Sequence, residues 1–326
     1  MTAASGPAEP MVEIQEPPEE GQRFALLAAL FDSKVTIAAA GFIVLILVLA
    51  VVGEAIAPYG ANEINVMNQL QAPSLTHFFG TDDLGRDVFS RVIIAARPSV
   101  MVSVVSVSLA LLAGVSIGLA SGFFGGWVDV TGMRMMDVIF SFPVMLLALA
   151  IVAMLGPGIW PAVLAIAVVY TPFFARITRA SVLTVREETY IKAARSIGAS
   201  NLRIMRLHVL PNIMAAIIVQ TSLSLAFAIL TEAALSFLGL GVQPPTPSWG
   251  RLLFDGRGFV TQAWWMAVFQ GAAIFLTVLA LNLVGDAMRD ALDPRQRSAI
   301  ESRRGNLRAP SSSWSISASA SARAWA

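Results

Sequence analysis

Few side chains in this 326-residue chain are of the types that carry out catalysis. Cysteine is absent and the only histidines are His77 and His208, so thiol chemistry and cysteine-ligated metal centres are excluded. One run, Gly114-Val115-Ser116-Ile117-Gly118, has the spacing of a serine nucleophile elbow, but that elbow needs a strand-turn-helix and a histidine partner. Here the run lies inside an apolar helical segment, and both histidines lie in predicted loops. We therefore expect no catalytic residue, no metal site and no cofactor.

Two other patterns concern phosphate and calcium. A phosphate-binding P-loop requires Gly-Lys-Ser/Thr, and neither lysine, Lys34 or Lys192, follows a glycine. The acidic run at 82–87 lacks the glutamate required at the twelfth position of an EF-hand loop, where Ile93 stands. We expect no ATP-binding site, and we expect the acidic run to cap a short amphipathic helix. The apolar face of that helix would carry Leu84, Val88 and Val92.

The apolar segment around Ser116 carries a small residue at every fourth position. This spacing places the small residues on one face of a helix. Small residues let two helix backbones approach closely inside a membrane. We therefore predict that Gly114, Gly118 and Gly122 form a helix-packing stripe.

Glu232 is an acidic residue within a predicted membrane helix, at the same depth as Glu54 in the first helix. It lies 19 residues beyond Ile213, where a predicted helix begins. At about 1.5 Å per residue, Glu232 sits near the outer rim of the bilayer core. Two interpretations stay open: a role in a pathway or its gate, and a role in packing at the interface. No ionisable residue reaches the midplane, which argues against an ion-coupled carrier.

The composition indicates a membrane protein, because 56% of the residues are hydrophobic and 13% are charged. Uncharged runs of about 20 residues or more can each cross a bilayer. We predict an all-α membrane protein with six transmembrane helices, near residues 35–57, 99–121, 136–155, 159–176, 213–237 and 264–285. The formal net charge of +1 gives no electrostatic footprint for nucleic acid. The lipid bilayer is the expected surrounding, and no nucleic-acid partner is expected.

The distribution of positive charge predicts the orientation. Of the 22 Lys and Arg residues, 17 fall on one side of the predicted helices, and an excess of positive charge marks the cytoplasmic side. Both termini are therefore expected in the cytoplasm. The expected segments are a disordered acidic tail (1–34), the first transmembrane helix (35–57), an external loop with the short amphipathic helix (58–97), a five-helix core (98–291) and a low-complexity tail (292–326).

The predicted cytoplasmic loop at 177–211 is basic and has a helical pattern. Thr184 and Glu187 have the spacing of a capping box for a short helix. Gly198 is placed to end that helix in a left-handed conformation, and Ser200 is placed to cap a second helix.

The first of these short helices would have one apolar face, formed by Ile191, Ala194 and Ile197. Helices of about ten residues are marginal alone and need a surface on which to dock. Ala193 and Ala194 offer a low-profile face for a protein partner. The alternative is a basic segment that lies on anionic lipid.

This loop resembles the EAA motif of ABC-importer permeases, E-A-A-x-x-x-G-x(9)-I-x-L-P. It reads Lys192-Ala193-Ala194-Arg195-Ser196-Ile197-Gly198 and, nine residues later, His208-Val209-Leu210-Pro211. Other blocks are similar to the C-type permease subunit of dipeptide and oligopeptide importers: 80–87, 125–127, 141–143, 155–158, 232–241, 244–250 and 292–295. The resemblance covers about two thirds of the chain. Lys192 replaces the motif glutamate, so a salt bridge from that glutamate is not carried over.

The resemblance implies a type I ABC-importer permease bundle in the cytoplasmic (inner) membrane, forming half of a translocation pathway for peptides. Implied partners are a B-type permease subunit, ABC ATPase subunits and an external substrate-binding protein. Implied ATPase-coupling residues are Glu187, Tyr190, Lys192, Ala193, Ala194, Arg195, Gly198 and Pro211. The alternative function is an ion-coupled secondary transporter or channel, which would need no ATPase.

Overall fold

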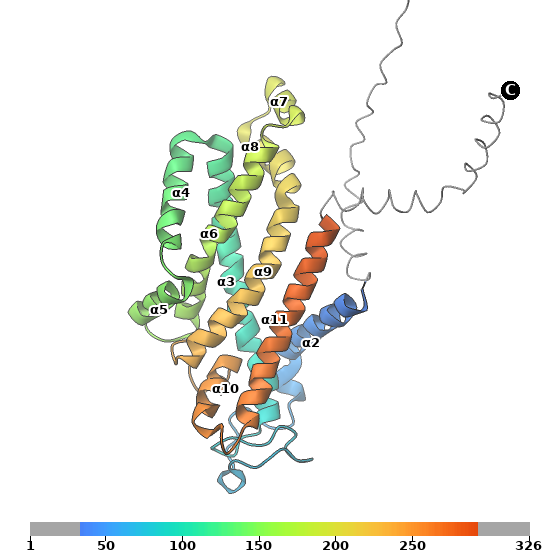
Figure 1. Ribbon diagram of the computed structural model, residues 1–326, viewed down its shortest axis with the longest axis vertical. Coiled ribbons are helices and arrows are strands. Elements are labelled where there is room, and N and C mark those ends of the chain that lie inside the picture. The colour runs from blue at the N-terminus through green and yellow to red at the C-terminus, as the bar shows by residue number, and fades with distance from the viewer. Residues whose placement is uncertain (1–32, 293–326) are drawn as a thin grey trace, which may run out of the picture.

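The computed structural model describes residues 33–292, which form an elongated helical bundle (Figure 1). Within that range the only β pairing is an isolated bridge between Thr81 and Asp87. The longer helices are α2 (Lys34–Ile56), α3 (Val88–Phe124), α4 (Gly126–Phe140), α5 (Val144–Leu155), α6 (Ile159–Val185), α9 (Leu210–Phe237) and α11 (Trp265–Leu292). The shorter elements are η1 (Val66–Asn68), α7 (Thr189–Ser196), α8 (Asn201–Ile204), the π-helix η2 (Met205–Val209), α10 (Trp249–Gly256) and η3 (Arg257–Phe259). Except for residues 33, 34 and 292, the two predicted tails lie outside the described residues.

Among the described residues, five helical segments are long and apolar enough to cross a membrane: Lys34–Ile56, Val88–Phe124, Ile159–Val185, Asn201–Phe237 and Trp265–Ala291. The bent pair α4 and α5 makes a sixth candidate span if it is counted as one. The all-α membrane architecture predicted from the sequence is therefore confirmed.

The third span differs from the single helix predicted near 136–155. It begins ten residues earlier, at Gly126, and it is broken, with α4 and α5 meeting at an angle of 89°. The break falls at Ser141-Phe142-Pro143. Pro143 disfavours a helical conformation at the residue before it and has no N–H to donate, so a new helix starts after it.

The second span also differs from the prediction. The separate amphipathic helix expected after the acidic run and the span expected from residue 99 are one helix, α3. Asp87 caps α3 as predicted, because its side chain accepts a hydrogen bond from the N–H of Ser90. Pro98 lies inside α3 without ending it. Leu84 precedes the helix, so the predicted stripe does not form as one face.

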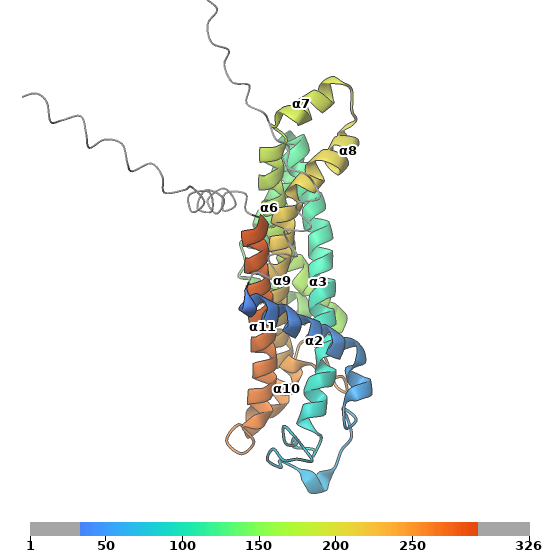
Figure 2. The same ribbon diagram turned by 90° about the vertical axis from the view of Figure 1, so that its right-hand side faces the viewer.

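The helix α3 lies against α6 at the centre of the bundle. A Cβ atom on Gly114 would lie 2.5 Å from Cβ of Phe174, and one on Gly122 would lie 2.8 Å from Cβ of Val182. Both distances are too short for a side chain, so the stripe faces α6 and only glycine fits there. The helix α2, in contrast, crosses α3 and α11 at a steep angle (Figure 2).

The fifth span begins well before residue 213, where the sequence predicted it. The elements α8, η2 and α9 follow one another without a loop, and together they form a 37-residue segment, Asn201–Phe237. The π-helical turn at Met205–Val209 marks the point where the short helices of the loop pass into the span. Such turns are frequent at functional sites.

Candidate functional site

A groove runs along the bundle between α5, α6 and α9, with a volume of about 620 Å³. We call it the neutral groove, because no charged residue lies among the described side chains that line it. Its lining residues are Val144, Met145, Tyr170, Phe173, Gln220, Leu223, Ser224, Phe227, Leu230, Thr231 and Ala234. The groove is therefore apolar in most of its wall, with four neutral polar side chains in it.

These polar side chains form two pairs. The hydroxyls of Tyr170 and Thr231 lie 3.0 Å apart, joining α6 to α9. Nε2 of Gln220 donates a hydrogen bond of 3.1 Å to Oγ of Ser224. The Thr231 hydroxyl also donates to the carbonyl of Phe227, so its pair with Tyr170 keeps only acceptor lone pairs. The Gln220 amide keeps its second N–H and its carbonyl oxygen among the described residues.

Sequence reasoning did not single out the polar residues of the groove. A signal was present on α9, because Gln220, Ser224 and Thr231 are spaced by four and seven residues and so share a helical face. The partner on α6, Tyr170, has no such signal. Its position follows only from the way α6 packs on α9.

The α7–α8 segment (Thr189–Ile204) protrudes at one end of the bundle, opposite the loop that joins α2 to α3 (Figure 1). Gly198 has a φ of +80° and ends the turn after α7, as predicted. Ser200 caps α8 through a hydrogen bond from the N–H of Arg203, also as predicted. The predicted capping box is wrong: α6 continues to Val185, and the Thr184 hydroxyl donates back to the carbonyl of Ala180.

The apolar face of α7 turns inward. Ile191 is fully buried and Ala194 is 9% exposed, and both pack in a cluster with Phe123 and Val182 of the bundle. The expectation that Ala194 offers its methyl group to a partner is therefore wrong. Ile197 is 86% exposed and does not share this face, because the helix ends at Ser196.

Two arginines, one just before α7 and one within it, fasten this part of the chain to α3. Nη1 of Arg186 donates a hydrogen bond of 2.8 Å to the carbonyl of Gly122. The Arg195 guanidinium lies 5.0 Å from the ring centre of Phe123. Other predicted coupling residues have exposed side chains: Glu187, Tyr190, Lys192, Ala193 and Pro211. Lys192 pairs with Glu187 at 3.6 Å, so the lysine that replaces the motif glutamate is held within its own chain.

The pKa of the Tyr190 hydroxyl on this surface is raised. Partial burial is the larger cause, and the negative charge of Glu188 raises the pKa further. The hydroxyl is therefore a neutral hydrogen-bond donor at physiological pH.

Glu232 lies in a buried polar cluster between α3, α9 and α10, away from the neutral groove. Its side chain is fully buried. Oε1 accepts a hydrogen bond of 2.7 Å from the Ser236 hydroxyl, whose oxygen accepts another from the N–H of Val242. Oε2 has no hydrogen-bond partner within the described part of the chain. Ser99 and Ser248 stand beside the same carboxyl group.

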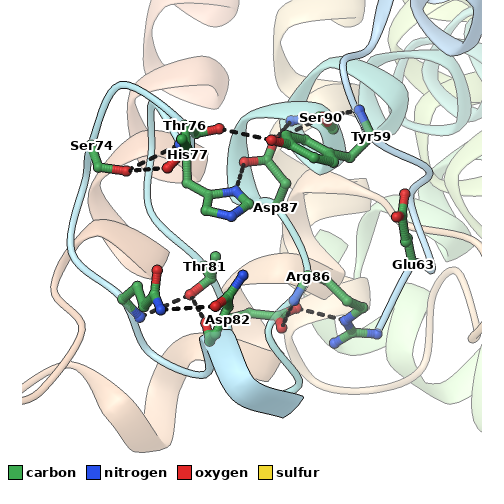
Figure 3. Close-up of polar contacts among 12 residues, drawn as sticks. Tyr59, Glu63, Ser74, Thr76, His77, Thr81, Asp82, Arg86, Asp87 and Ser90 are labelled. Atoms are coloured by element: carbon green, nitrogen blue, oxygen red, sulfur yellow. Dashed lines mark hydrogen bonds and ion pairs between the residues drawn. The ribbon is translucent and has the colours of Figure 1, made fainter. Parts of the chain in front are cut away.

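The loop between α2 and α3 folds into an ordered polar cap, shown in Figure 3. Asp82 is its hub: Oδ1 accepts from the N–H groups of Leu84 and Arg86, and Oδ2 accepts from the side chains of Arg86 and Arg91. Nearby, Nδ1 of His77 lies 2.9 Å from Asp87.

Asp83 stands beside this hub without comparable support. Its Oδ1 has no hydrogen-bond partner among the described residues, and Arg86 is 3.9 Å away. Burial raises the pKa of the Asp83 carboxyl, and the charge of Asp82 raises it further. The acidic run predicted to cap a helix thus builds an arginine-bound cap instead, with Asp87 alone at the start of α3.

Two family models match the chain. The model described as a binding-protein-dependent transport system inner membrane component matches residues 114–298. The model described as the N-terminal TM domain of oligopeptide transport permease C matches residues 26–73.

Individual relatives point the same way. A dipeptide transport system permease protein of Alkalihalophilus pseudofirmus is 43% identical over 88% of this chain and 96% of its own length. A glutathione transport system permease protein of Escherichia coli is 45% identical over 79% of this chain and 85% of its own length. Among solved structures, an inward-facing conformation of the MetNI methionine ABC transporter matches with a TM-score of 0.52 and 17% identity. That match covers 62% of this chain and 96% of the other, and it shows a shared fold.

Proposed function

Since the chain belongs to the binding-protein-dependent transport inner membrane family, and within it to the C-type permease subunits of ABC peptide importers, we propose that the neutral groove forms its half of the peptide pathway. The observation that carries this proposal is the row of neutral polar groups on an otherwise apolar wall. Facing lipid, the Gln220 side chain would gain nothing from its remaining N–H and carbonyl oxygen.

The chemistry of the groove suits a peptide. A peptide backbone presents amide donors and acceptors at every residue, whereas its side chains vary. Hydroxyl and amide groups can exchange hydrogen bonds with any backbone, and without a fixed charge they do not hold one side chain over another. The pair Tyr170 and Thr231 spans α6 and α9, so a peptide that bonds to it contacts both helices.

The α7–α8 segment is our candidate for the contact with the ATPase subunits. Its exposed side chains supply the contact surface, while Ile191 and Ala194 seat the helix on its own bundle. The surface consists of Tyr190, Lys192, Ala193 and Arg195 of α7 together with Glu187, which precedes the segment. Gly198 sets the turn, and Pro211 lies at the start of α9. A helix packed firmly on its own bundle can transmit a movement of the ATPase subunits to that bundle. A loose basic segment on lipid cannot.

The continuity of α8, η2 and α9 provides the route for coupling. A displacement of α8 is carried along one continuous helix to Gln220 and Ser224 in the groove. In this mechanism ATP closes the ATPase pair, the α7–α8 segment moves with it, and the groove opens outward to accept a peptide. Hydrolysis then resets the bundle. The end carrying α7 is accordingly cytoplasmic, and the loop between α2 and α3 is external.

The remaining partners are a B-type permease subunit, which supplies the other half of the pathway, and an external binding protein, which delivers the peptide. The relatives are ABC transporter permeases, so an ion-coupled secondary transporter or channel is not favoured. The chain itself supplies no ATP-hydrolysing chemistry in this proposal; the ATPase partners do.

Peptide uptake by the reconstituted complex tests the proposal. We expect ATP-dependent uptake of a labelled dipeptide into liposomes that hold this chain, its partner permease and the ATPases. The double variant Gln220→Leu/Thr231→Val should lower uptake without loss of assembly. The matched control is Thr277→Val on α11, because the Thr277 hydroxyl donates only to Ala273 of its own helix. Uptake by this chain alone, or unchanged uptake in the double variant, would contradict the proposal.

A further inference from the structure

A second cavity of about 610 Å³ lies between α4 and α6, and unlike the neutral groove it is charged. We call it the charged pocket. Its lining residues are Asp129, Val130, Met133, Arg134, Asp137, Arg176 and Arg179. It lies toward the end of the bundle that carries α7, because Arg176 and Arg179 are in the second half of α6.

The charged pocket follows the neutral groove along α6 and is displaced around the helix from it. Tyr170 and Phe173 line the groove, and Arg176 and Arg179 line the pocket. Each step of three residues falls short of a full turn, so the lining passes gradually to another side of α6. Phe140 of α4 bridges the two cavities. Its ring lies 4.7 Å from that of Phe173, and the Arg176 guanidinium lies 4.2 Å from its centre.

Two of the three arginines in the pocket are already paired. Arg179 donates two hydrogen bonds to Asp129, with Nη2 lying 2.6 Å from Oδ2. Arg176 donates one of 2.7 Å to Asp137. Arg134 is exposed and forms no ion pair with any described residue. The pocket therefore carries one positive charge in excess, on a guanidinium with all its donors available.

We propose that the charged pocket is an exit subsite that binds the C-terminal carboxylate of the transported peptide, with Arg134 as the binding side chain. This inference rests on the proposed pathway function of the neutral groove. The neutral groove offers a peptide no fixed charge, and the charged pocket is joined to the groove through Phe173, Phe140 and Arg176. The planar guanidinium of Arg134 matches a carboxylate in a two-bond arrangement. The paired arginines hold the shape of the pocket and leave one site for one anion.

The test compares a dipeptide that has a free carboxylate with its C-terminal amide, in the reconstituted complex. Arg134→Gln should lower the initial uptake rate of the free peptide by about tenfold, as expected for loss of a charged hydrogen bond, and should lower that of the amide much less. Arg134→Lys, which keeps the charge, should recover part of the rate for the free peptide. The control is Arg289→Gln on α11, an exposed arginine remote from the pocket.

Three results would overturn the inference. Equal losses for peptide and amide would make Arg134 a structural residue, and unchanged rates would remove it from the pathway. A defect seen only in liposomes that contain phosphatidylglycerol would assign the pocket to an anionic lipid headgroup. Absence of ATP-dependent uptake in the unmodified complex is a different failure, because it would reject the proposed function itself.

Discussion

A Cβ atom on Gly118 would lie 2.4 Å from the carbonyl oxygen of Ala175. That oxygen belongs to the backbone of α6 and cannot turn away as a side chain can. The contact therefore fixes the separation of α3 and α6 more strictly than the side-chain contacts do. Since α6 also supplies one wall of the neutral groove, the fit at Gly118 helps to set the position of that wall.

Replacing Gly118 with alanine should push α3 away from α6. Overpacking of this kind typically costs about 1–3 kcal/mol, and it should lower the membrane abundance of the assembled complex. The larger side chain in Gly118→Leu should lower this abundance further. Gly41→Ala in α2 is the matched control, because a Cβ atom there meets nothing within 4 Å. Equal abundance of the Gly118→Ala and Gly41→Ala variants, measured by immunoblot of purified membranes, would show that α3 and α6 tolerate separation.

Gly198→Val should uncouple the chain from its ATPases. A φ of +80° strains a β-branched residue even though the space around Gly198 is open, whereas asparagine adopts this conformation more readily. The expected result is loss of co-purifying ATPase for valine and near-normal retention for asparagine, with equal membrane abundance of both. If valine and asparagine behave alike, the conformation of this turn does not matter for docking.

Glutamate substitutions at the neighbouring residues Ala193 and Ala194 of α7 should have different effects on ATPase docking and on permease abundance. Ala193 is exposed, so Ala193→Glu should weaken ATPase docking and leave the permease folded. Ala194 packs on the bundle, so Ala194→Glu buries a charge and should also lower permease abundance. Co-purification of the ATPase, normalised to the amount of permease, separates the two. Normal docking in Ala193→Glu would exclude this face from the contact.

How much the sequence predicts depends on how local each feature is. The glycine stripe and the turn at Gly198 follow from spacing and from the conformational freedom of glycine, which are local properties. The direction of Ala194 was mispredicted because a small apolar residue suits a docking face and a buried face equally well. Only the positions of Phe123 on α3 and Val182 on α6 decide between them.

Hydropathy has a similar limit at the third span. A long uncharged run predicts that a membrane is crossed, but it says nothing about direction, and the 89° bend between α4 and α5 has no signature in hydropathy. Pro143 was the available signal. The neutral groove could not be predicted from local sequence, because Tyr170 and Thr231 are 61 residues apart and meet only in the folded bundle.

The adjacent aspartates Asp82 and Asp83 in the polar cap should have opposite effects on stability. The raised pKa of Asp83 means that folding disfavours its charged form, so stability falls as the pH rises from the ordinary carboxyl value of 3.8 through the raised value. Above that range the penalty is complete. Asp83→Asn should therefore raise the thermal midpoint at pH 7.5, and the gain should shrink as the pH falls toward 3.8. Asp82→Asn should lower the midpoint at pH 7.5, because it weakens bonds to Arg86 and Arg91. Destabilisation by Asp83→Asn at pH 7.5 would contradict this account.

The last prediction decides between the two interpretations of Glu232. Because its carboxyl group is fully buried and bonded to Ser236, we expect it to hold α9 to the segment after it and not to act as a gate. Glu232→Gln keeps an acceptor for the Ser236 hydroxyl, so abundance and peptide uptake should stay close to normal. Glu232→Ala leaves that hydroxyl without its acceptor, at a cost of about 1–3 kcal/mol, and should lower abundance.

Combining Glu232→Ala with Ser236→Ala tests whether the hydrogen bond carries the effect. If it does, the double variant should lose less abundance than the two single losses together, because residues that share a bond are coupled. Uptake should follow abundance in every variant. A gate would give a different pattern, in which Glu232→Gln reaches the membrane in normal amounts but transports poorly. That pattern would show that Glu232 acts in the pathway or its gate. Because its side chain is buried in the structure, Glu232 would then have to become exposed during transport.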